Sequence, residues 1–122
     1  MTDLTGRVVV VAGVAANVGA IAAALQDTGA SVALVALADV ARTDVTVHVR
    51  ADPSDADVWD RVSMHVEQHL GPVDAVVADA SAEPLVRAVF ATDLRRRGHG
   101  DVVVVRDGDD VADVVTRVVG TQ

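Results

Sequence analysis

The chain has 122 residues, enough for one compact domain but too few for a second core. Its 18 acidic and 10 basic residues give a net charge of −8, which opposes nucleic-acid binding, and the absence of cysteine excludes disulfides and thiolate chemistry. No leader precedes Val8, and no apolar run approaches the ~18 residues of a membrane span. We therefore expect a soluble cytoplasmic protein with no nucleic-acid or membrane partner.

Valine-rich apolar runs alternate along the chain with amphipathic stretches, which predicts alternating strands and helices. The predicted strands are 7–12, 31–37, 45–49, 73–78 and 102–105, and the predicted helices are 18–26, 56–70, 83–97 and 111–119. Ser54 or Asp55 is expected to cap the second helix, and Asp109 or Asp110 the last. Because alternating strands and helices imply right-handed βαβ crossovers, this order predicts an α/β protein with a doubly wound parallel sheet of five strands, ordered 3-2-1-4-5.

A glycine-bearing turn joins the first predicted strand to the first predicted helix, with Gly13 and Gly19 on either side of it. Glycines let a backbone pass close to a ligand, and the free N–H groups of a helix N-terminus attract phosphate. The turn therefore predicts a ligand that carries phosphate. Together with the predicted parallel sheet, it fits a three-layer Rossmann-like fold over a single minimal domain, residues 1–122.

Several segments resemble, in the same order, motifs of the short-chain dehydrogenase/reductase family. They are LTGRV at 4–8, AGVAANVG at 12–19, GASV at 29–32, ADPSD at 51–55, LGPVD at 70–74, ADAS at 78–81 and RRGHGDV at 96–102. The set covers nearly the whole chain. It implies that the chain resembles the N-terminal, cofactor-binding half of that family, in a truncated and degenerate form.

The resemblance implies NAD or NADP as cofactor, with six contact residues: Gly13, Asn17, Val18, Gly19, Asp52 and Ala78. Asn17 stands where the family has the middle glycine of its turn. It can still adopt a left-handed backbone, but its side chain fills space that a pyrophosphate would approach, so binding is expected to be weak or lost.

Two aspartates each have two possible roles. Asp52 corresponds to a family residue that contacts adenine, and the alternative is that it caps the following helix. Asp39 lies twenty positions after Gly19, a separation compatible with a ribose contact, and the alternative is a solvated loop residue.

The family's catalytic tyrosine and lysine have no counterpart, because the sequence contains neither residue type. We therefore predict no catalytic residue, and a non-catalytic dinucleotide-binding or structural subunit with a protein partner or a second copy of itself. The helix at 83–97 could offer Leu85, Val89 or Phe90 to such a copy. The alternatives are an NAD(P)-dependent oxidoreductase that uses a partner subunit or a non-standard mechanism, and a truncated product without function.

Two further patterns each have an ordinary structural alternative. His65 and His69 have the i, i+4 spacing of metal ligands, but no glutamate completes a zinc motif, so a solvated helix face is expected and no metal is predicted. The run Arg95 to Arg97 could bind a phosphate or an acidic partner, and the alternative is that it complements the dipole at a helix end.

Overall fold

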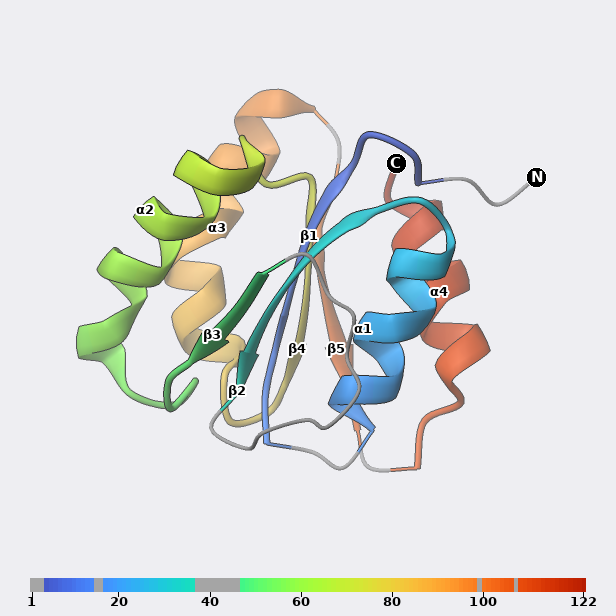
Figure 1. Cartoon of the computed structure of the whole chain (residues 1–122), viewed down its shortest axis with the longest axis horizontal. Coiled ribbons are helices and arrows are strands. Elements are labelled where there is room, and N and C mark those ends of the chain that lie inside the picture. The colour runs from blue at the N-terminus through green and yellow to red at the C-terminus, as the bar shows by residue number, and fades with distance from the viewer. Residues whose placement is uncertain (1–3, 15–16, 37–46, 99, 107) are drawn as a thin grey trace.

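A computed structural model describes residues 4–14, 17–36, 47–98, 100–106 and 108–122. The strands are β1 (Val8–Ala12), β2 (Ser31–Ala36), β3 (Val47–Arg50), β4 (Ala75–Asp79) and β5 (Val102–Val105), and the helices are α1 (Val18–Asp27), α2 (Trp59–Leu70), α3 (Glu83–Arg97) and α4 (Val111–Gly120). The strands form one parallel sheet in the order β3-β2-β1-β4-β5, and the helices cover both faces (Figure 1). The predicted Rossmann-like α/β fold is confirmed.

Two apolar cores lie on opposite faces of the sheet. Because successive strand residues point to opposite faces, Val9 and Val11 of β1 contribute to the core beneath α1 and α4, while Val8 and Val10 contribute to the core beneath α2 and α3. All four valines are buried, as expected for a parallel strand covered on both sides.

Polar side chains set the helix boundaries. The segment predicted as one helix over 56–70 is a short 3-10 helix (Ala56–Val58) followed by α2, and the Asp55 carboxylate caps its start by accepting the Asp57 N–H at 2.9 Å. Asp110 caps α4 in the same way, accepting the Ala112 N–H at 2.9 Å. The predicted bounds of α3 are confirmed at both ends.

A buried carboxylate ties the amino-terminal edge of the sheet together. Asp74, which is 4% exposed, accepts the Val8 N–H at 2.8 Å and pairs with the Arg97 guanidinium at 2.7 Å, with Arg7 at 3.8 Å. Arg97 also donates to the Val73 carbonyl. The role of Arg97 is therefore an internal ion pair, which neither the phosphate-binding nor the helix-dipole interpretation had anticipated.

Among the described residues, none of the helices combines the length and apolar character needed to cross a bilayer. The predicted cytoplasmic location stays a prediction.

Candidate functional site

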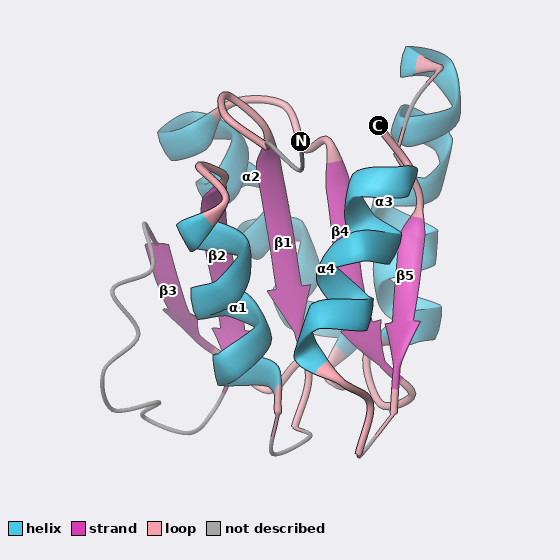
Figure 2. Cartoon of the chain, turned by 90° about the vertical axis from the view of Figure 1, so that its right-hand side faces the viewer, coloured by secondary structure: helices cyan, strands magenta, loops and turns pink. Residues whose placement is uncertain are grey.

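The carboxyl ends of all five strands lie at one edge of the sheet, as the parallel arrowheads in Figure 2 show. Because β1 is flanked by β2 on one side and β4 on the other, the chain leaves β1 at the point where the strand order reverses. Ligands of open α/β sheets bind in the crevice at such a point. The turn after β1 is therefore the place to look for a binding site.

Asp79 lies directly against the glycine turn. Its Oδ2 accepts the Val14 N–H at 2.7 Å, and a Cβ added at Gly13 would lie 2.5 Å from the Asp79 Cγ. Position 13 therefore has no room for a side chain, because the end of β4 packs against the turn. The close approach explains this glycine by packing alone.

The Asp79 carboxylate is itself held in place by the residue that follows β4. Its Oδ1 accepts the Ser81 hydroxyl at 2.5 Å and the Ser81 N–H at 3.1 Å. Asp79 is 6% exposed, so a buried, hydrogen-bonded carboxylate forms the floor of the turn. Any anionic ligand of this turn must lie close to that negative charge.

Asn17 directs its side chain away from the turn and toward the loop before α4. Its Nδ2 donates to the Arg106 carbonyl at 3.2 Å and the Asp109 carbonyl at 3.5 Å, while its buried Oδ1 meets no donor among the described residues. Its φ of −89° is right-handed helical, so the left-handed conformation considered for it is wrong. Contacts with the distant loop select the observed conformation.

The α1 N-terminus is free of a side-chain cap, because the Asn17 side chain is engaged elsewhere. Val18 and Gly19 are buried in the first turn, and the first helical hydrogen bond runs from the Ile21 N–H to the Asn17 carbonyl at 3.0 Å. The N–H groups before Ile21 have no carbonyl acceptor within the helix. This end of α1 can therefore donate hydrogen bonds to a ligand phosphate.

Asp52 lies after β3, two strands away from the glycine turn. Its Oδ1 accepts the Ser54 hydroxyl at 2.6 Å and the Ser54 N–H at 2.9 Å. These two hydrogen bonds hold the pKa of the Asp52 carboxyl below its ordinary value, against a small opposing effect of burial. The helix-capping alternative for Asp52 is wrong, since Asp55 fills that position.

The carboxyl edge thus contains five of the six predicted contact residues in one group around β1, α1 and β4, with Asp52 further along the edge. Ala78 is fully buried inside the sheet, and the adjacent Asp79 is the residue that reaches the turn. Asp79 was not among the predicted contact residues, although an acidic residue at the end of an otherwise apolar strand is a signal that could have identified it. Asp39 lies outside the described residues.

In the part of the chain that the structure describes, no group of three or more potential metal ligands occurs. The rings of His65 and His69 lie 4.1 Å apart between centroids, and the His69 Nδ1 lies 2.8 Å from the His65 carbonyl oxygen. Two imidazoles on one helix face are too few ligands for a structural zinc site.

No protein-family model and no curated protein matches the chain, whereas solved structures do. The ligand-free aldohexose dehydrogenase of Thermoplasma acidophilum gives a TM-score of 0.74 at 16% identity, over 98% of this chain and 60% of that one. A short-chain dehydrogenase from Bacillus anthracis gives 0.65 at 12% identity, over 81% and 54%. The enoyl-(acyl-carrier-protein) reductase of Anaplasma phagocytophilum, in complex with NAD, gives 0.50 at 27% identity, over 63% and 34%.

These structural neighbours include short-chain dehydrogenases, and what the chain shares with them is the Rossmann-like fold. The chain spans 60% and 54% of the lengths of the first two.

The residues present fit a dinucleotide in part. The uncapped α1 N-terminus and the exposed turn residue Val14, which is 64% exposed, leave an approach for phosphate. In contrast, the Asp79 carboxylate occupies one turn N–H and adds a negative charge nearby. The N-terminal end of α1 would attract the phosphates of a dinucleotide bound here. Repulsion from the Asp79 carboxylate would offset part of that attraction.

Proposed function

We propose that the chain is a non-catalytic dinucleotide-binding subunit, a single Rossmann-like domain that binds NAD or NADP weakly at the glycine turn and acts with a protein partner. The observation that carries this proposal is the uncapped α1 N-terminus beside the glycine turn, at the point where the strand order reverses. In this proposal the first turn of α1 holds the pyrophosphate, and Asp52 lies toward the adenosine end.

The non-catalytic part of the proposal rests on the chemistry of the side chains. The sequence contains no tyrosine and no lysine, so it has no tyrosine acid whose pKa a lysine could lower. The alternative, an NAD(P)-dependent oxidoreductase completed by a partner subunit, draws on the dehydrogenases among the structural neighbours. Turnover of an alcohol or carbonyl substrate by the purified chain alone would overturn the non-catalytic assignment.

A second copy of the chain is less well accommodated on α3 than the sequence suggested. Phe90 is 2% exposed and belongs to the core, so it is not free for an interface. Leu85 and Val89 are partly buried against the same core. We therefore favour a heterologous partner over a dimer through this helix.

Calorimetric titration with NAD⁺, NADH, NADP⁺ and NADPH tests the binding proposal. Ala20 lies exposed in the first turn of α1, so Ala20→Glu places a negative charge beside the proposed phosphate site without disturbing the core. Ala20→Gln is the matched neutral control. We expect binding that Ala20→Glu abolishes and Ala20→Gln retains, and absence of binding at millimolar ligand would contradict the proposal.

A further inference from the structure

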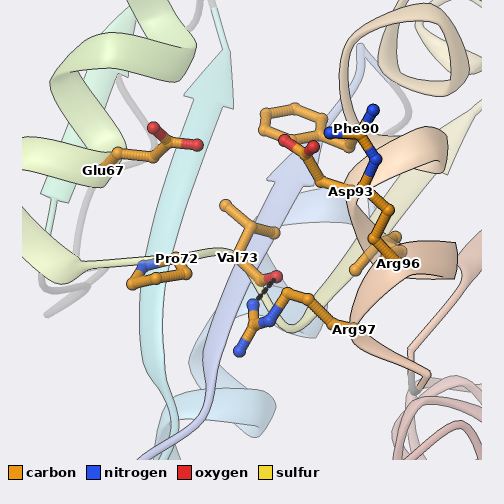
Figure 3. Close-up of a pocket in the computed structure, with 8 residues that line it drawn as sticks. Glu67, Pro72, Val73, Phe90, Asp93, Arg96 and Arg97 are labelled. Atoms are coloured by element: carbon orange, nitrogen blue, oxygen red, sulfur yellow. Dashed lines mark hydrogen bonds between the residues drawn. The ribbon is translucent and has the colours of Figure 1, made fainter.

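A cavity of about 200 Å³ lies between α2 and α3, beside the segment that enters β4 (Figure 3). It lies toward the amino-terminal edge of the sheet, whereas the glycine turn lies at the carboxyl edge. Sites for drug-sized ligands and cofactors usually measure about 300–1,000 Å³, so this cavity fits a smaller molecule. A ligand here is independent of the proposed dinucleotide site.

The floor of the cavity is apolar and held firmly. It consists of Val73, Phe90 and Leu94, which are all buried. The Phe90 ring packs edge-on against Trp59 with centroids 6.1 Å apart, and Arg97 donates to the Val73 carbonyl while it pairs with buried Asp74. Because contacts outside the cavity fix the positions of Phe90 and Val73, the cavity is preformed for an apolar group.

The rim of the cavity carries charges of both signs. Glu67 comes from α2, and Asp93 and Arg96 come from α3. Figure 3 shows the carboxylates of Glu67 and Asp93 on opposite sides of the cavity, with Arg96 beside Asp93. Within the described ranges, none of these three side chains forms an ion pair or hydrogen bond with another residue. All three are therefore available to a ligand.

We propose that this cavity binds a free α-amino acid with an apolar side chain. The ligand's ammonium group lies between the Glu67 and Asp93 carboxylates, its carboxylate meets the Arg96 guanidinium, and its side chain covers Phe90, Leu94 and Val73. Charged groups of both signs around an apolar floor match a small zwitterion with one apolar branch. A simple amine would leave the Arg96 guanidinium without a partner, and a simple fatty acid would leave the Glu67 and Asp93 carboxylates without one.

Titration of the ¹⁵N-labelled full chain with L-leucine, followed by NMR, tests this proposal. Two analogues separate the charges: 3-methylbutylamine lacks only the carboxylate of leucine, and 4-methylpentanoate lacks only its ammonium group. We expect saturable shifts at the amides of Val73, Phe90 and Leu94 with leucine, and each analogue to bind about fivefold more weakly.

Three exposed positions on α3 provide the variants. Asp93→Asn and Arg96→Gln should each weaken leucine binding about fivefold, whereas Arg95→Gln, which changes a neighbouring arginine that does not line the cavity, should not. Because these side chains are solvent-exposed, the variants should keep the fold, and their NMR spectra verify it. The proposal is overturned if leucine causes no saturable shift, if an analogue binds as tightly as leucine, or if neither lining variant changes the affinity.

Discussion

Asp79 and Val14 are joined by a 2.7 Å hydrogen bond from the Val14 N–H to the Asp79 carboxylate, which fastens the turn after β1 to the end of β4. The bond connects residues 65 positions apart, and the same carboxylate leaves no room for a Cβ at Gly13. The geometry of the candidate site therefore depends on a buried acid as much as on its glycine.

Replacing Gly13 with alanine tests this arrangement. The new methyl group would lie 2.5 Å from the Asp79 Cγ, so we expect Gly13→Ala to lower the free energy of unfolding by about 1–3 kcal/mol, as overpacking does. Urea unfolding measures this loss. In an Asp79→Ala background the same substitution should cost clearly less, and an unchanged cost would show that the contact is not the cause.

Asn17 offers a second test, because its amide links the start of α1 to the loop before α4. Asn17→Ala removes two hydrogen bonds and also the unpaired Oδ1, so we expect a modest loss of about 0.5–1 kcal/mol in unfolding free energy. Asn17→Asp should lose more, because a carboxylate oxygen would face the Arg106 and Asp109 carbonyls. Equal stability of Asn17→Asp and the unmodified chain in urea would contradict this linkage.

Sequence patterns predicted what is local in this fold, and missed what joins distant segments. The bounds of α3 follow from Pro84 near its start and Gly98 after its end, where φ is +75°, and the alternation of apolar runs predicted the strand order. The conformation of Asn17 could not be predicted, since its partners Arg106 and Asp109 lie about ninety residues away. Such pairs become visible only once the sheet has brought the ends of its strands together.

The ion pair between Arg97 and Asp74 should make a large contribution to stability. Arg97→Ala leaves a buried carboxylate with Arg7 at 3.8 Å, so we expect a loss of about 2–3 kcal/mol, below the full value for a buried pair because Arg97 is partly exposed. Arg95→Ala on the same helix turn is the control and should change stability by less than about 0.5 kcal/mol. Similar losses for the two variants in urea unfolding would argue against a special role for Arg97.

The lowered pKa of Asp52 predicts that the stability of the fold depends on pH, and the titration of this one residue can be followed. Its pKa is lowered in the folded chain by the Ser54 hydroxyl and N–H, so its contribution to stability is present above the ordinary value of 3.8 and is lost as the pH falls through the folded pKa. Ser54→Ala removes the hydroxyl donor and should raise the Asp52 pKa. An NMR titration of the Asp52 carboxyl carbon measures it, and an unchanged pKa in Ser54→Ala would refute this explanation.

The most direct measurement for the proposed dinucleotide site is an NMR titration of the labelled chain with NAD⁺ and NADH that locates the binding residues. We predict saturable shifts that gather at the carboxyl edge of the sheet, at Gly13, Val14, Val18 and Gly19, extend to Asp52, and disappear in Ala20→Glu but not in Ala20→Gln. Shifts confined to other parts of the chain, or no saturable shift at millimolar dinucleotide, would contradict the account and leave the glycine turn with a packing role alone.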